Sequence, residues 1–214
     1  MSSDTSPAPA RGHSALAGKV RWRRFALIFV PAIGITGLLL GLTAEGALAS
    51  SFSISGQQFQ VSADSLTGTG FQQFGTVDEE VGNKPVAVAQ SEIGSAKIKN
   101  LCQSVVANFP LGLGTYTLRI SAGGSTPVSA SSLIIDANQL SGSTASFHQI
   151  NIGQDASTLN AVSGVPDGAP GSFGQQAAGI VIANLRQTAY STSAGTFTLP
   201  GFSLSLSAGA KPCF

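Results

Sequence analysis

Two different hydrophobic patterns divide the chain into a short front part and a longer back part. From Phe25 to Leu42 the sequence reads FALIFVPAIGITGLLLGL, an apolar run in which Thr36 is the only polar side chain. A helix of this length covers about 27 Å, close to the thickness of the hydrocarbon core of a bilayer. The run therefore predicts one hydrophobic helix, over residues 25–44, that is either the core of a signal peptide or a transmembrane helix.

Behind residue 50 the hydrophobic period changes to two, which is typical of β-strands with one buried face. Apolar residues alternate with polar ones in four clear tracts, and each tract is expected to pack its apolar face into a core. The longest run of breakers, GVPDGAPGSFG over residues 164–174, predicts an irregular loop. The back part, residues 50–214, is therefore expected to be all-β. The four alternating tracts are residues 51–55, 58–62, 116–121 and 202–207.

Short phrases of the back part recur in the same order. Their spacing is nearly constant, at 84, 81 and 86 residues, which predicts a duplicated unit of about 85 residues with copies near 96–123 and 180–209. The alternative is that strand-forming tracts of biased composition resemble each other by chance. The phrases are IKNLCQS at 98–104 and IANLRQT at 182–188, GTYTL at 114–118 and GTFTL at 195–199, and Ser-Ala-Gly at 121–123 and 207–209.

A duplicated all-β unit can build two similar half-sheets over a shared core. A single β-sandwich or β-roll is therefore the expected architecture. A β-solenoid is the alternative, and it is less favoured because solenoids usually stack three or more repeats whereas two copies are visible here.

The placement of charge orients the hydrophobic helix. Residues 1–24 contain five basic residues and one acidic residue, and Arg21, Arg23 and Arg24 directly precede the apolar run. Basic residues stay on the cytoplasmic side of a membrane. This predicts a basic cytoplasmic tail over residues 1–24 and an extracytoplasmic β domain over residues 50–214.

Whether the helix is removed stays open. Ala47 and Ala49 form the small-x-small pattern of a signal-peptidase site, with Ser50 as the first mature residue. Against cleavage, the apolar run is longer than that of most signal peptides and Glu45 lies between the run and the site. The domain is thus expected to be either secreted or anchored to the cytoplasmic membrane by this helix.

Low charge excludes one class of partner. Charged residues make up 10% of the chain, and the part from Ser50 onward holds six scattered basic residues and eight acidic ones. Binding to nucleic acid requires a basic face, so a nucleic-acid partner is not expected.

Two cysteines, Cys102 and Cys213, both lie in the part expected outside the cytoplasm. An oxidising compartment favours disulfides, so the sequence predicts a Cys102–Cys213 bond. A metal site is not expected, because two cysteines and one histidine do not complete the usual set of four ligands.

The search for catalytic chemistry finds one weak candidate, His148, the single histidine after residue 50. No Gly-x-Ser-x-Gly elbow accompanies it. His148 alternates in phase with Ile150 and Ile152, so we expect it to point toward the core or its rim as a structural residue. The acidic run at 78–80 lacks the spaced ligands of a calcium loop and is interpreted as a solvated turn. No sequence motif for a cofactor is present.

Several phrases together resemble an uncharacterised actinobacterial family of exported proteins. They are AEGALAS at 44–50, SGQQFQVSAD at 55–64, NLCQSV at 100–105, QINIG at 149–153 and the cysteine next to the C-terminus. Some relatives are labelled cholesterol esterase by automatic annotation, although the family supplies no catalytic residues to carry over.

Three functions are compatible with this sequence. The first is a structural or binding module of the cell envelope, without enzymatic activity, whose partner is an envelope protein, a glycan or a lipid. The alternatives are a lipid ester hydrolase with a non-standard site around His148, or a lipid carrier.

Overall fold

The computed structural model describes residues 56–82, 84–109 and 114–214. The expected helix over 25–44 and the candidate cleavage residues Ala47, Ala49 and Ser50 lie outside the described residues. In the part that is described, no helix combines the length and the apolar character needed to cross a membrane.

The expectation of an all-β domain is confirmed. The described residues form one antiparallel sheet of ten strands and one short 3-10 helix. The elements are β1 (Phe59–Glu80), β2 (Lys84–Lys99), β3 (Leu101–Phe109), β4 (Gly114–Ala122), β5 (Val128–Ser141), β6 (Thr144–His148), β7 (Asn151–Asp155), η1 (Ala156–Thr158), β8 (Phe173–Ser193), β9 (Thr196–Thr198) and β10 (Ser203–Ala208).

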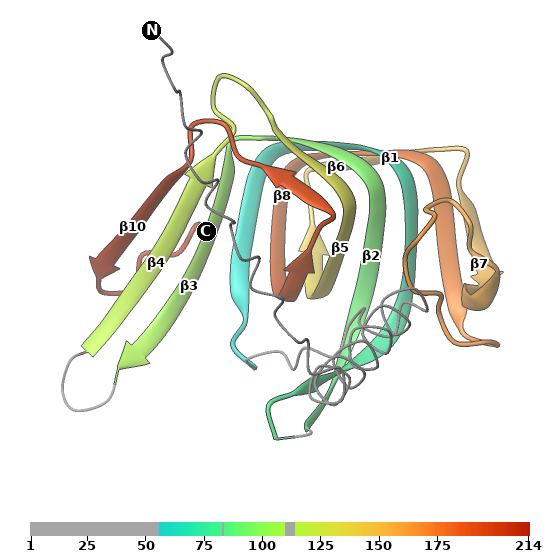
Figure 1. Ribbon diagram of the computed structural model, residues 1–214, viewed down its shortest axis with the longest axis horizontal. Helices are drawn as coiled ribbons and strands as arrows, with labels where there is room; N and C mark the ends of the chain where they lie inside the picture. Colours follow the sequence, from blue (N-terminus) through green and yellow to red (C-terminus); the bar gives the residue numbers. More distant parts are fainter. Residues whose placement is uncertain (1–55, 83, 110–113) are drawn as a thin grey trace, which may run out of the picture. The chain divides into compact units, whose positions relative to one another are not determined.

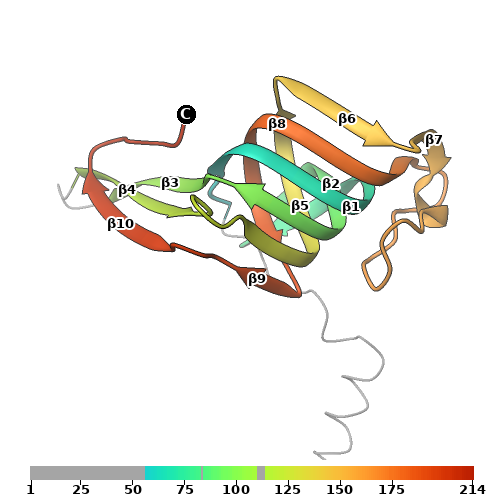
Figure 2. The same ribbon diagram turned by 90° about the horizontal axis from the view of Figure 1, so that it is seen from above.

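Four long strands close into a ring. β1 pairs with β2, β2 with β5, β5 with β8, and β8 pairs back with β1. Figures 1 and 2 show these strands curling around a common interior. All ten strands of the described residues thus belong to a single sheet, whereas the duplicated unit predicted two half-sheets over a shared core.

The interior of the ring is a hydrophobic core. Its largest fully buried apolar side chains are Phe71, Leu133 and Val128. Ile93 and Ile180 pack in the same cluster from β2 and β8. Two small apolar cavities among the core side chains have volumes of about 60 and 30 Å³, so the ring is filled rather than hollow.

The two repeat phrases flank β1. Val61 pairs with Gln103 on one side and with Gln187 on the other. Leu66 pairs in the same way with Ile98 and Ile182. The partners are 84 residues apart at both places, which equals the offset between the phrases. The register is compatible with a duplicated unit, and the duplication itself stays a prediction.

Asn100 and Asn184, at equivalent positions of the two phrases, both have a left-handed backbone, with φ of 52° and 49°. Asparagine tolerates this conformation better than most residues. The Asn100 side-chain amide donates a 2.5 Å hydrogen bond to Asp64, and the Asn184 amide donates a 2.9 Å hydrogen bond to Ser143. The chain changes from β2 to β3 at Asn100, whereas β8 continues through Asn184.

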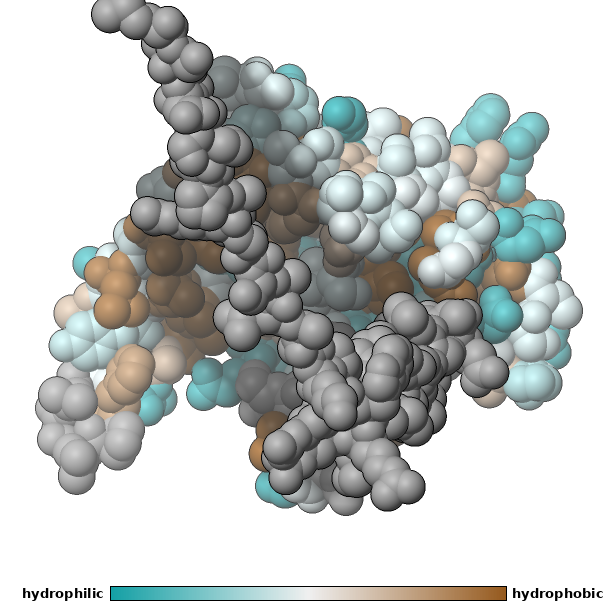
Figure 3. Space-filling model, viewed as in Figure 1, coloured by the Kyte–Doolittle hydropathy of each residue, from teal (hydrophilic) through white to brown (hydrophobic). Residues whose placement is uncertain are grey.

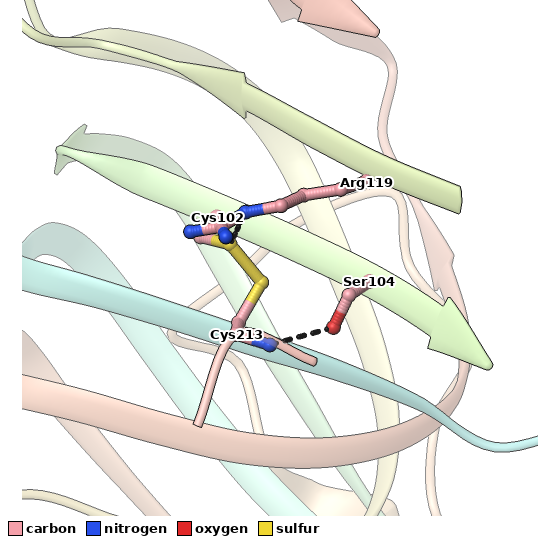
Figure 4. The surroundings of a disulfide bond; sticks show 4 residues. All are labelled: Cys102, Ser104, Arg119 and Cys213. Atoms are coloured by element: carbon pink, nitrogen blue, oxygen red, sulfur yellow. Dashed lines mark hydrogen bonds between the residues drawn. A yellow bond between two sulfur atoms is a disulfide. The ribbon is translucent and has the colours of Figure 1, made fainter. Parts of the chain in front are cut away.

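Strands β3, β4 and β10 extend beyond the ring as a separate part of the sheet, which we call the wing (Figure 1). The predicted disulfide is present: Cys213 in the C-terminal segment bonds to Cys102 on β3, with a Cα–Cα distance of 5.9 Å. The backbone N–H of Cys213 also donates a 2.9 Å hydrogen bond to Ser104 (Figure 4). This segment is therefore fastened to the wing.

One expectation about packing is wrong. The alternating tract over 202–207 was expected to bury its apolar face, but Phe202, Leu204 and Leu206 are 54%, 55% and 64% exposed. Alternation gives residues a common face, but burial requires a second layer over that face. Among the described residues no such layer covers the apolar side chains of β10.

Candidate functional site

A surface groove of about 350 Å³ lies where the beginning of β8 meets the start of β7 and the segments that follow β6 and η1. It is lined by the amide side chains of Gln149, Asn151 and Gln176 and by small residues that include Ala177 and Ala178. None of these residues carries a charge. We call this hollow the amide groove.

Gln176, on β8, holds one wall of the amide groove in place. Its side-chain oxygen accepts hydrogen bonds from the backbone N–H of Asn160, at 2.7 Å, and of Ala161, at 3.1 Å. Its side-chain amide donates to the side-chain oxygen of Asn160 at 3.1 Å. The side-chain oxygen and amide of Gln176 are thus both hydrogen-bonded to the segment 160–161, and Gln176 holds that wall of the groove in position.

Gly70, on β1, allows the wall to approach the sheet. Its φ is +65°, and a Cβ atom at this position would lie 2.6 Å from the backbone oxygen of Ala161. Only glycine combines the left-handed backbone with the absence of a Cβ at no steric cost. The shape of the amide groove at this side therefore depends on Gly70.

A buried polar network beneath the same segment supports it. Gln72 is fully buried, accepts a 3.1 Å hydrogen bond from the backbone N–H of Val162, and donates a 2.5 Å hydrogen bond to Glu92. Gln90 donates a 2.6 Å hydrogen bond to the other carboxylate oxygen of Glu92. Burial raises the pKa of Glu92, although these two hydrogen bonds act in the opposite direction.

Asp155 closes the loop between β7 and β8. One of its oxygens accepts hydrogen bonds from the backbone N–H and the hydroxyl of Ser157, and the other accepts a 2.7 Å hydrogen bond from the N–H of Gly171. The hydrogen bonds from Ser157, and then that from Gly171, lower the pKa of Asp155. Since η1 also packs Ala156 against Phe74 of β1, the loop is held at both ends and in its middle.

Two side chains of the amide groove have no hydrogen-bond partner among the described residues. Gln149 and Asn151 are exposed, and neither side chain is hydrogen-bonded to another residue of the described ranges. Gln149 has φ of +54°, which is uncommon for a residue other than glycine. Both residues belong to the phrase QINIG, whose residue types alone predict no role for them.

His148 lies next to Gln149 at the end of β6, and it is exposed. His148 was expected to point toward the core or its rim; it does not reach the core, and Ile150 and Ile152, which share its phase, are 36% and 67% exposed. The reason is that β6 lies at the edge of the sheet, beside β8 (Figure 2). Within the described ranges no hydrogen bond or ion pair joins His148 to a serine or a carboxylate, so the structure does not assemble a Ser-His-acid site there.

The acidic residues lie apart from the amide groove lining. Asp78 and Asp136 each have one buried oxygen without a hydrogen-bond partner. Burial, and then the charge of Asp136, raise the pKa of Asp78 to about 6. Asp78 is thus partly buried rather than fully solvated as the turn was expected to be. In the described part of the chain, no group of three or more His, Cys, Asp or Glu residues could hold a metal ion.

Comparison with known proteins identifies a family and no function. A family model described as a family of unknown function, DUF6230, matches residues 55–214, which is most of the chain. No curated protein and no solved structure is similar.

Proposed function

The chain belongs to the DUF6230 family of unknown function, and we propose that it is a binding module of the cell envelope, displayed outside the cytoplasmic membrane. Its ligand is a neutral polar molecule, the sugar units of an envelope glycan, bound in the amide groove. The observation that supports this most directly is the groove itself: about 350 Å³, uncharged, and lined by two free amide side chains.

The chemistry of the lining suits a sugar. An amide side chain both donates and accepts hydrogen bonds, and a sugar hydroxyl does the same. The volume lies within the range of about 300 to 1,000 Å³ that is common for small-molecule sites. Because no lining residue is charged, a neutral ligand leaves no ion without a partner.

Display outside the cytoplasm is supported by the basic start of the chain, by the apolar run from Phe25 to Leu42 and by the disulfide. Structural disulfides persist in oxidising compartments and are rare in the cytosol. An envelope glycan is a partner that only a protein on that side of the membrane would meet.

The two alternative functions have less support. Ester hydrolysis requires a base that is hydrogen-bonded to a nucleophile, and His148 makes no hydrogen bond to a serine of the described ranges. A lipid carrier requires an apolar cavity that encloses an acyl chain, and the larger cavity inside the ring has a volume of only about 60 Å³. Both observations favour a surface site over an internal one.

The test is binding of neutral oligosaccharides to the purified protein, measured by saturation-transfer NMR and titration. The panel contains hexose, pentose and N-acetylhexosamine oligomers. We expect at least one class to bind, and the double substitution Gln149→Ala with Asn151→Ala to weaken binding by tenfold or more, since it removes both free amides of the groove.

The matched control is Gln139→Ala, which removes an exposed amide from β5, outside the amide groove, and should leave binding unchanged. Equal binding by the double variant and the parent protein would contradict the proposal. Hydrolysis of an ester substrate that His148→Ala abolishes would favour the hydrolase instead.

A further inference from the structure

The wing has two unlike faces. In antiparallel strands, directly paired residues place their side chains on the same face. Leu206 pairs with Leu118, which pairs with Val105, so one row of apolar side chains crosses β10, β4 and β3. Leu204 lies on the same face of β10, two residues from Leu206.

This apolar wing face is defined by Val105, Phe109, Tyr116, Leu118, Leu204 and Leu206, and none of these residues is charged. Figure 3 shows hydrophobic residues gathered over the wing. The exposed fractions are 47% for Phe109, 37% for Leu118 and 64% for Leu206. Exposed apolar area of this kind, on one continuous face, marks a surface that contacts another apolar phase.

The opposite face is polar and partly covered. Ser205 pairs with Arg119, which pairs with Ser104, so the second row of side chains is hydrophilic. The C-terminal segment is fastened to this side by the disulfide and by a 2.9 Å hydrogen bond from the N–H of Lys211 to Thr117. The described chain therefore covers part of the polar face, over Thr117 and Ser104, and leaves the apolar wing face open.

Charge on the wing indicates what kind of surface it meets. β3, β4, β10 and the segment 209–214 contain two basic side chains, Arg119 and Lys211, and no acidic side chain. The eight acidic side chains after Ser50 all belong to other parts of the domain. Both basic residues belong to the polar side of the wing: Arg119 stands in the polar row, and the backbone N–H of Lys211 donates to Thr117 on that side. The apolar wing face itself has no acidic side chain that would be repelled by the anionic boundary of a lipid bilayer.

The length of the chain brings such a surface within reach. Thirteen residues separate the end of the apolar run at Leu42 from Gly56, the first described residue. Even fully extended, they span at most about 45 Å. We take the apolar run here as a retained membrane anchor, one of the two outcomes that the sequence leaves open, and a domain tied to a bilayer in this way meets it at a high effective concentration.

We infer that the apolar wing face rests on the surface of the lipid bilayer, with Leu204 and Leu206 inserted among the lipid chains. Phe109 and Tyr116, whose rings pack edge to face at 5.6 Å, contribute aromatic rings of the kind that favour the boundary between lipid and water. This inference does not depend on the amide groove, which other residues form.

The first test places a tryptophan on each face of the same strand. The full chain, with its single tryptophan removed by Trp22→Phe, is reconstituted in vesicles of phosphatidylglycerol and phosphatidylethanolamine. In this background, brominated lipids should quench the fluorescence of Leu206→Trp at least threefold more than that of Ser205→Trp. Acrylamide in the aqueous phase should show the reverse order.

The matched position Ser205 makes the outcomes distinct, because it is the neighbour of Leu206 on β10 and its side chain lies on the opposite face. If both tryptophans were quenched by acrylamide and neither by lipid, the face would be in water and the inference would be wrong. If Leu206→Trp were shielded from both quenchers, the face would be covered by a second copy or another protein, which also overturns the inference.

A second measurement avoids tryptophan substitutions and the tether. Residues 53–214 form a compact unit with its own core, and they should float with anionic vesicles on a density gradient. Leu204→Ser with Leu206→Ser should reduce the bound fraction at least tenfold, whereas Ser203→Ala with Ser205→Ala should not. Absence of flotation for the parent unit would refute bilayer contact by the wing, whatever the result with sugars.

Discussion

Removal of the Cys102–Cys213 disulfide tests how the end of the chain contributes to stability. The bond joins residues separated by 111 positions. A cross-link over a loop of this length reduces the conformational entropy of the unfolded chain by an amount equivalent to about 4.7 kcal/mol. We therefore expect the double substitution Cys102→Ala with Cys213→Ala to lower the free energy of unfolding by about 4 to 5 kcal/mol.

The folded state should change less than the unfolded state. In the variant the C-terminal segment can still donate from the N–H of Lys211 to Thr117 and from the N–H of residue 213 to Ser104, both at 2.9 Å. Each such hydrogen bond contributes about 1 kcal/mol. The matched control Ser104→Ala keeps the cross-link, removes one of these bonds and should therefore cost only about 1 kcal/mol.

Urea denaturation followed by circular dichroism measures both effects. For a domain of this size, a loss of 4 to 5 kcal/mol corresponds to a fall in Tm of roughly 10 to 20 °C. Reducing agent should lower the stability of the parent protein to that of the double variant and leave the variant unchanged. A loss below about 1 kcal/mol, or a parent protein insensitive to reduction, would refute the reasoning.

Two further substitutions test the groove wall and the partly buried carboxylate. Gly70→Ala places a Cβ 2.6 Å from the backbone oxygen of Ala161 at a φ of +65°, so it should lower the free energy of unfolding, measured by urea denaturation, by about 2 kcal/mol. The control is Gly75→Ala, whose Cβ meets nothing within 4 Å and which should lower that free energy by less than about 0.5 kcal/mol. Asp78 has its pKa raised to about 6 by burial and by Asp136, so the folded state binds its proton more tightly and stability falls as pH rises from about 4 to 6. Asp78→Asn should flatten that part of the pH profile, and parallel profiles for parent and variant would contradict this assignment.

Local patterns were sufficient for the class of the fold and for the disulfide. Period-two alternation is a property of neighbouring residues, so the all-β class could be predicted before any strand was paired. With two cysteines, Cys102 and Cys213, only one intramolecular pairing exists. Both repeat phrases pair with the same stretch of β1. The two residues that pair with Val61, Gln103 and Gln187, are therefore 84 positions apart, which is also the offset between the phrases.

Alternation did not determine which faces are covered. His148 and Leu206 both follow an alternating pattern, and both are exposed because no other layer of the described chain covers the face on which each of them lies. The pattern assigns side chains to a face, but burial of that face depends on which distant element packs against it. This is why the sequence placed these residues toward a core and the structure places them on the surface.

The sequence by itself determined the strand-forming character of the back part, the apolar run near the front and the pairing of the cysteines, because each depends on residue type and local order. Only the tertiary structure decided where a ligand could bind. Gln149 and Gln176 are 27 positions apart in the chain, and Gly70 and Ala161 are 91 apart. They meet because β6 and β7 both pair with β8 while β8 pairs with β1, and a contact between such distant residues leaves no local trace in the sequence.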